Sequence, residues 1–131
     1  MTGEDTPRGH SLNARFLVIE AGKEDVDTAI LTELQGYAAS GLFAATMFFF
    51  IKWLAPQMDH LRIFIQQRKD DLRDKAVKVA LSHARPPALI ASLIIGLEMF
   101  LTFGIDHKAI SEEDALKLRD QAWDLLLAAD A

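Results

Sequence analysis

Two arginines are the side chains of this chain whose positions most need a chemical explanation. Arg15 stands at the entrance to a short apolar run, and Arg85 directly precedes Pro86-Pro87 at the start of an apolar helix. A guanidinium beside the positive end of a helix needs an anion or a carboxylate to compensate it. A planar fork of donors aimed at a phosphate would explain this placement. Taken alone, Arg85 favours the structural alternative, in which it reaches solvent or pairs with an acid such as Asp59.

Other catalytic chemistry finds little support in the sequence. There is no phosphate-binding loop, dinucleotide-binding glycine motif, zinc-protease motif or nucleophile elbow, and cysteine is absent. The histidines are scattered without ligand spacing, so we expect no metal site; they are His10, His60, His83 and His107. The acidic run Glu112-Glu113-Asp114 falls in a predicted first helical turn, where carboxylates favour the helix dipole. We therefore assign that run a structural role.

Composition sets broad limits. The chain has 131 residues, of which 50% are hydrophobic, enough for one domain with a real core. Its net charge of −5 argues against a dedicated nucleic-acid coat. The absence of cysteine and the polar first residues, which contain no signal-peptide core, favour the cytoplasm.

The run after Arg15 predicts the single β-strand of the chain. Phe16–Ile19 is apolar and rich in β-formers, and Ala21-Gly22 follows it. A strand that is apolar on both faces belongs inside a sheet, yet no second convincing strand exists. We therefore expect either the tail of a larger domain or a strand that completes a partner's sheet.

Everything from about Asp27 onward reads as helix, so the predicted fold class is mainly α: one orphan strand followed by a bundle of four to five packed helices. The expected helices cover about 27–55, 57–82, 86–104 and 111–129. Asp27 or Thr28 is the expected N-cap of the first, Pro56 ends it, and Gly36 and Gly41 are its expected bends. Ser111 opens the last helix, with Asp114 in a capping-box position.

Helical spacing also predicts which side chains face the core. In 57–82 an apolar stripe includes Ile65, Leu72 and Ala76. The charged residues of 68–71 and 73–75 are expected to form a solvated surface rather than a nucleic-acid patch. The helix 86–104 carries two apolar stripes and is predicted to be largely buried. In the last helix the expected core face comprises Leu118, Ala122, Leu125 and Ala129.

Two segments are long and apolar enough to suggest a two-span membrane hairpin. Residues 34–51 carry no charge, and 86–105 carry only Glu98. Polar side chains in the first segment and the cost of placing Glu98 in lipid count against this alternative. A pair between Lys52 and Glu98 across two packed helices would serve a soluble or a membrane protein equally.

Several short motifs, taken in order and spacing, resemble those of a known ATPase group over nearly the whole chain. They are Thr2-Gly3-Glu4-Asp5, Pro7-Arg8-Gly9-His10-Ser11-Leu12, Ala14-Arg15 with Phe16–Glu20, Asp25-Val26-Asp27, Trp53-Leu54-Ala55-Pro56, His83-Ala84-Arg85-Pro86-Pro87, Gly96, Phe100-Leu101-x-Phe103, Ala109-Ile110-Ser111 and the Trp123 helix. This pattern is similar to the C-terminal part, from sensor 1 to the lid, of AAA+ helicase-like or primase-associated ATPases of prophages, integrated plasmids and other mobile elements. The resemblance implies that the chain is a fragment of an α/β AAA+ ATPase.

The resemblance also implies roles for four residues. Thr2 would follow the sensor-1 strand and lie near the γ-phosphate. Arg15 would be the arginine finger, with Arg8 the second candidate, reaching the nucleotide of a neighbouring subunit. Arg85 would be the sensor-2 arginine. Residues 1–26 would then end the ATPase core, with Phe16–Ile19 as its last strand, and 27–131 would form the helical lid.

The chain departs from the family because the phosphate loop and the Walker B acid would lie upstream of it. We therefore expect the isolated chain to lack catalysis, with ATP and Mg²⁺ bound only in the full-length parent. The implied partners are the upstream ATPase core or a neighbouring subunit, and DNA through the parent; a homo-oligomer and a membrane contact stay open. The alternative functions are a small two-span helical membrane protein and a helical interaction module that pairs its strand with a partner sheet.

Overall fold

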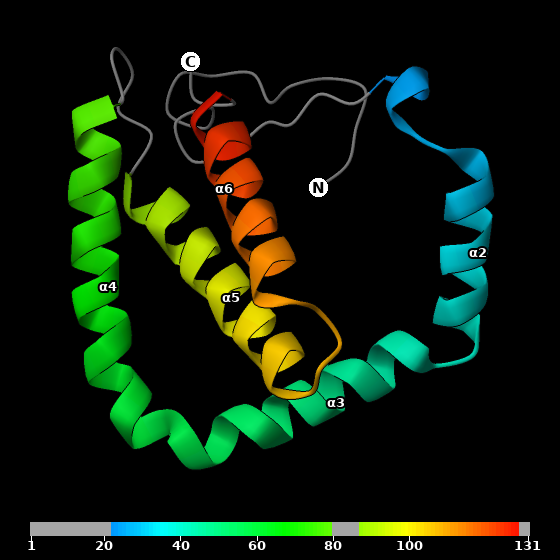
Figure 1. The fold of residues 1–131 in the computed structure, drawn as a ribbon, viewed down its shortest axis with the longest axis horizontal. Coiled ribbons are helices and arrows are strands. Elements are labelled where there is room, and N and C mark those ends of the chain that lie inside the picture. Colours follow the sequence, from blue (N-terminus) through cyan, green and yellow to red (C-terminus); the bar gives the residue numbers. More distant parts are fainter. Residues whose placement is uncertain (1–21, 80–86, 129–131) are drawn as a thin grey trace, which may run out of the picture. The chain divides into compact units, whose positions relative to one another are not determined.

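A computed structural model describes residues 22–79 and 87–128, and in these residues the chain is mainly helical with no strand (Figure 1). The elements are η1 Lys23–Asp25, α2 Thr28–Ala39, α3 Leu42–Leu54, η2 Ala55–Gln57, α4 Met58–Val79, α5 Pro87–Asp106 and α6 Glu112–Ala128. The predicted helical class is thus confirmed. The predicted strand at 16–19 lies outside the described residues, as does most of the 1–26 segment. The chain divides into two compact units, whose described parts are residues 22–61 and residues 62–79 with 87–128.

The first unit begins with the predicted cap. The Asp27 carboxylate accepts hydrogen bonds from the backbone N–H groups of Ala29 at 2.9 Å and Ile30 at 3.2 Å. The single helix expected over 27–55 is two helices, because Gly41 adopts a left-handed φ of 80° and ends the first ladder. Gly36, the other expected bend, lies inside α2. Pro56 ends α3 as predicted, through the 3₁₀ turn η2.

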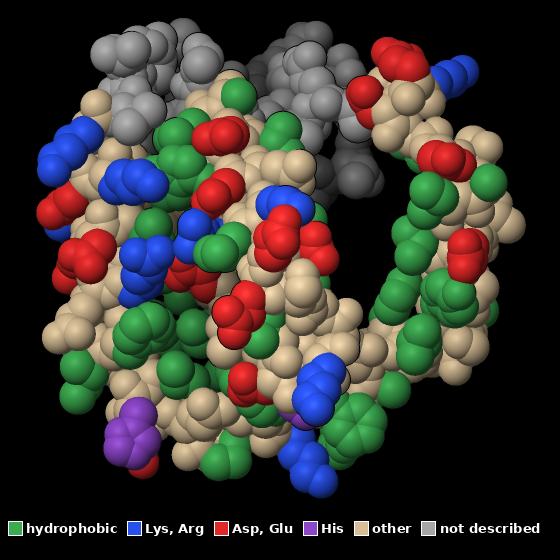
Figure 2. Space-filling view, viewed as in Figure 1, with side chains coloured by type: hydrophobic (Ala, Val, Ile, Leu, Met, Phe, Trp, Pro, Cys, Tyr) green, Lys and Arg blue, Asp and Glu red, His purple; other side chains and the backbone are tan. Residues whose placement is uncertain are grey.

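The helices α2 and α3 contain no buried residue. Their large hydrophobic side chains are exposed by 41% to 61%; these are Ile30, Leu31, Leu34, Tyr37, Leu42, Phe43, Met47, Phe48, Phe49 and Ile51. Figure 2 shows hydrophobic side chains following α2. The apolar surface of this unit therefore has no cover within the described residues.

The core lies in the second unit, among α4, α5 and α6. Its buried cluster comprises Leu72 from α4 and Ile90, Ala91, Ile94 and Ile95 from α5. Partly buried side chains pack against this cluster; they are Ile65, Met99, Ala122, Trp123, Leu126 and Leu127. The side chains of α5 thus form the centre of the core, while Figure 2 shows acidic and basic side chains mixed over α4 and α6.

The end of α5 differs from the prediction. The helix begins at Pro87 as expected but continues past Gly104 to Asp106. The residue in the left-handed conformation is Lys108, with φ 56°, and the N–H of Ala109 donates to the carbonyl of Gly104 at 2.8 Å in a Schellman-type cap. A Cβ on Gly104 would lie 3.0 Å from the Ile110 side chain. Glycine at 104 therefore permits the close approach of Ile110 rather than ending the helix.

Two predicted core faces are wrong in part. Ile90 and Ile94 of one α5 stripe are buried, but Leu93 and Phe100 of the other are 44% and 39% exposed. The physical reason is that the core lies on one side of α5, where Leu72 of α4 and side chains of α6 pack, so the stripe that includes Leu93 and Phe100 is only partly covered.

The packing face of α6 is also rotated from the predicted one. Leu118 and Leu125, expected in the core, are 46% and 69% exposed, whereas Ala115 is 4% exposed and Trp123 packs on the core cluster. Ala122 faces the core as predicted, and Ala129 lies outside the described residues. The face of α6 that packs on the core therefore carries Ala122, Trp123, Leu126 and Leu127 in place of Leu118 and Leu125.

The start of α6 yields a first prediction. Ser111 Oγ accepts from the N–H of Asp114 at 3.1 Å and donates to the Asp114 carboxylate at 2.7 Å. Ser111→Ala removes this cap and is expected to cost about 1 kcal/mol, or roughly fivefold faster hydrogen exchange in α6. Ser92→Ala is the matched control, because the exposed Ser92 only donates to the Ala88 carbonyl within α5. Equal effects of the two variants would contradict the capping role.

Candidate functional site

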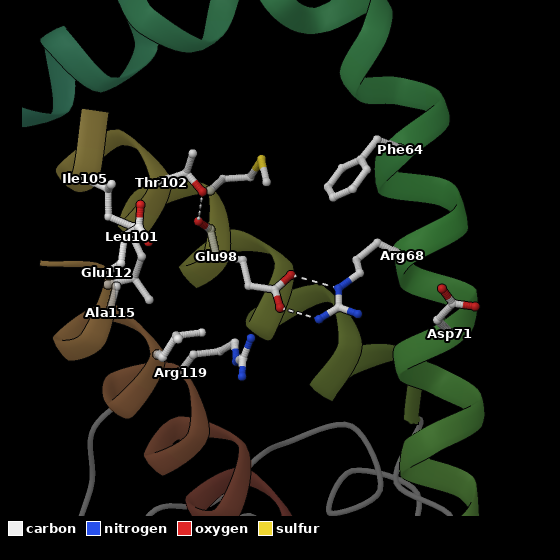
Figure 3. A pocket seen from close by; sticks show the side chains of 12 residues that line it. Phe64, Arg68, Asp71, Glu98, Leu101, Thr102, Ile105, Glu112, Ala115 and Arg119 are labelled. Carbon is white, nitrogen blue, oxygen red and sulfur yellow. Dashed lines mark hydrogen bonds and ion pairs between the residues drawn. The ribbon is translucent and has the colours of Figure 1, made fainter. Parts of the chain in front are cut away.

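The second unit contains a pocket of about 600 Å³ among α4, α5 and α6 (Figure 3). Its lining comprises Phe64, Arg68 and Asp71 from α4, then Glu98, Met99, Leu101, Thr102 and Ile105 from α5, and Glu112, Ala115, Leu116 and Arg119 from α6. Half of these side chains are apolar, and the charged ones include Arg68, Glu98 and Arg119, which approach one another in Figure 3. The pocket therefore combines an apolar wall with a charged cluster.

A bidentate ion pair joins α4 to α5 at the pocket. Arg68 Nη2 donates to Glu98 Oε1 at 2.6 Å, and Arg68 Nε donates to Glu98 Oε2 at 3.1 Å. The side chains of Arg68 and Glu98 are 33% and 15% exposed. Two parallel hydrogen bonds fix the orientation of both groups as well as their distance. The pair therefore sets the register of α4 against α5.

The hydrogen bond to Glu98 raises the pKa of Arg68 above its ordinary value, and partial burial opposes this rise. An arginine is protonated at any physiological pH in any case, so this guanidinium remains a cation. The Glu98 carboxylate has both oxygens engaged by the guanidinium. It is therefore a structural acceptor and a poor candidate for a general base.

Arg119 brings a second guanidinium to the same region from α6. It donates to the Asp120 carboxylate at 3.0 Å through Nε and at 2.7 Å through Nη2. A smaller cavity of about 110 Å³ shares Arg68, Glu98 and Arg119 with the larger pocket. Lys75, which also lines this cavity, places its ammonium 4.6 Å from the centre of the Trp123 ring. The charged cluster of Arg68, Glu98 and Arg119 thus lines both the pocket and the smaller cavity.

The structure does not describe the four predicted site residues. Thr2, Arg8, Arg15 and Arg85 all fall outside the described residues, so their roles stay predictions. Within the described ranges no group of three or more His, Asp or Glu side chains is placed to hold a metal ion.

Two expectations about charged residues are corrected. Glu98 pairs with Arg68 rather than with Lys52, and Arg68 does not lie on the solvated side of α4. The sequence does carry a signal for this arrangement. Arg68 follows Ile65 by three residues and precedes Leu72 by four, which places it on the apolar stripe. Arg119 stands four residues from both Ala115 and Trp123 on the packing face of α6.

The arrangement suits binding rather than catalysis. Its guanidinium groups are already paired with carboxylates, and the apolar wall offers contact area for an apolar group. No protein-family model, no curated protein and no solved structure matches this chain. The functional conclusion therefore depends on the residues of the chain itself.

Proposed function

We propose that this chain is the sensor and lid portion of a DNA helicase-like AAA+ ATPase of mobile elements. The observation that carries the proposal is the position of α5, which begins at Pro87, two residues after Arg85. Ile90, Ala91 and Ile94 anchor the first half of α5 in the core. The N-terminus of a helix is the positive end of its dipole, so an arginine two residues ahead of it in the sequence would be suited to respond to an anion bound there.

In this proposal the remaining sites take the roles that the resemblance implies. Arg15 is the arginine finger, Arg8 is the second candidate, and Thr2 lies near the γ-phosphate. The nucleotide and Mg²⁺ are bound by the upstream ATPase core of the parent, which acts on DNA in the cytoplasm. The helices from residue 27 onward form the lid, and its movement couples nucleotide state to the neighbouring subunit.

Two measurements test the proposal. The DNA upstream of Met1 is expected to encode, in frame, a phosphate loop and a Walker B strand. In the parent protein, Arg85→Ala is expected to weaken ATP binding about tenfold, or ~1.4 kcal/mol, because a charge-assisted contact to phosphate is lost.

Arg73→Ala is the matched control for Arg85→Ala. Arg73 is 49% exposed and pairs with Asp70 and Asp74 on the surface of α4, so its loss is expected to leave ATP affinity unchanged. An upstream region without these motifs, or equal affinities of the two variants, would contradict the proposal.

A two-span membrane protein is the second candidate, and one observation favours it. α5 has 20 residues and a hydropathy of 2.1 over its most apolar window, and α2 passes the same test together with the helical stretch Leu42–Lys78, bent by 66°. Against a span, 33% of the α5 window is buried in the unit, and Glu98 pairs with Arg68 of α4. Labelling of single cysteines introduced at the two ends of α5, from one side of a sealed vesicle, distinguishes the two candidates, since a true span places these ends on opposite sides of the membrane.

A further inference from the structure

The exposed apolar side chains of α3 point in all directions around its axis. Leu42, Phe43, Met47, Phe48, Phe49 and Ile51 are each 48% to 61% exposed. At about 3.6 residues per turn these positions cover the full circumference of the helix. A groove on a protein partner covers one face of a helix, whereas lipid surrounds it. The distribution therefore favours lipid as the occupant.

The hydroxyl groups of the same stretch have partners inside their own helices. The hydroxyls of Ser40 and Thr46 donate to the carbonyls of Tyr37 at 2.8 Å and Leu42 at 3.0 Å, and the Tyr37 hydroxyl donates to Glu33 at 2.6 Å. Residues 34–51 carry no charged side chain. A segment that satisfies its hydroxyls internally loses little on leaving water, which is the condition that a bilayer imposes.

The ends of α3 have the features of a membrane–water interface. Lys52 and Trp53 stand near its C-terminal end, and both residue types combine an apolar body with a polar tip. At the other end no side chain caps the helix at Gly41, so the first N–H groups of α3 need water or lipid headgroups. The C-terminal end of α3 is therefore suited to headgroup level, and the uncapped N–H groups after Gly41 need to stay within reach of water or headgroups.

We propose that α3, together with the C-terminal half of α2, inserts into one leaflet of a lipid bilayer as a monotopic anchor. The 13 residues of α3 span about 20 Å, too short for a hydrocarbon core of about 30 Å, so the helix lies within the leaflet. The proposed anchor uses no residue that lines the pocket. It adds a membrane attachment to the proposed lid, and it stands whether or not the ATPase proposal holds.

Vesicle flotation of the full chain tests the anchor. The chain is synthesised in the presence of phosphatidylcholine vesicles, which are then floated through a density gradient. We expect the wild-type chain to float with the vesicles and Phe48→Asp/Phe49→Asp to lower the floating fraction at least tenfold, because two carboxylates would enter the apolar region. Leu118→Asp/Leu125→Asp is the matched control, since it changes two exposed leucines of α6 and is expected to float like wild type.

Three results would overturn the anchor. The first is a wild-type chain that does not float, and the second is equal flotation of the two double variants. The third is flotation only when anionic phosphatidylglycerol is added, which would indicate attraction by charge rather than insertion of α3. Light scattering without vesicles identifies a rival occupant: an oligomer that Phe48→Asp/Phe49→Asp dissociates, from a chain that does not float, would assign the surface to a second copy.

Discussion

Ile94→Ala is expected to lower the free energy of unfolding of the α4–α6 unit by about 3 kcal/mol. Ile94 is 1% exposed and is the largest fully buried side chain among the described residues. It belongs to the core cluster that includes Leu72 and Ile90, so truncation removes contacts with more than one helix. Hydrogen exchange of the α5 amides is expected to speed up roughly a hundredfold, because each 1.4 kcal/mol is about tenfold.

Leu125→Ala provides the matched control for Ile94→Ala. Leu125 is also an aliphatic side chain in a helix of the same unit, but it is 69% exposed. Its truncation is expected to change the free energy of unfolding by less than about 0.5 kcal/mol. If both variants exchanged at the same rate, α5 would not lie at the centre of the core.

Glu98→Ala is expected to cost about 2–3 kcal/mol, since it leaves the Arg68 guanidinium only 33% exposed and without its carboxylate. The double variant Arg68→Met/Glu98→Leu is expected to lie within about 1 kcal/mol of wild type, because replacing both charges removes the desolvation penalty. Hydrogen exchange across α4 and α5 measures both variants. A large cost of the single variant beside a small cost of the double variant would show that the two side chains stabilise the protein mainly through each other.

A surface pair calibrates this coupling. Lys117 and Glu113 form an i,i+4 ion pair at 2.7 Å whose side chains are 62% and 79% exposed. Alanine substitutions there are expected to show a coupling of about 0.3–0.5 kcal/mol. A Glu98→Ala cost in that same range would mean that the Arg68–Glu98 pair behaves as a solvated surface pair.

Local signals predicted the elements of this fold well. The signals at Asp27 and Ser111 are capping hydrogen bonds to N–H groups two or three residues away, and the signal at Pro56 is its missing N–H. Because each of these effects is local, it can be predicted from the sequence alone. The break at Gly41 was expected as a bend and is a complete interruption, since a left-handed residue cannot continue the ladder.

The faces of the helices were harder to predict, because they depend on which neighbours are present. α5 carries two apolar stripes of similar character, and only the positions of α4 and α6 decide which one is buried. The pairing of Glu98 was mispredicted for a related reason. All charged residues of 68–71 and 73–75 were expected to face solvent, although Arg68 shares the helical spacing of Ile65 and Leu72.

The candidate site was the least predictable part. Thr2, Arg8, Arg15 and Arg85 lie outside the described residues, so the nucleotide roles remain a proposal. The pocket beside Arg68 and Glu98 is assembled from three helices, and no local motif announces a hollow of that kind. The residues that line the pocket can be predicted only after it is known which faces of the three helices pack together.

The two tryptophans of the chain fall one in each unit. Trp53 lies near the end of α3 and stacks on Phe50, with ring centres 6.1 Å apart, whereas Trp123 packs against the core beneath the Lys75 ammonium. Replacing either one by phenylalanine leaves a single indole whose fluorescence reports on one unit alone. The emission of Trp53 then follows the entry of α3 into lipid, and that of Trp123 follows the opening of the three-helix core, in the same full-length protein.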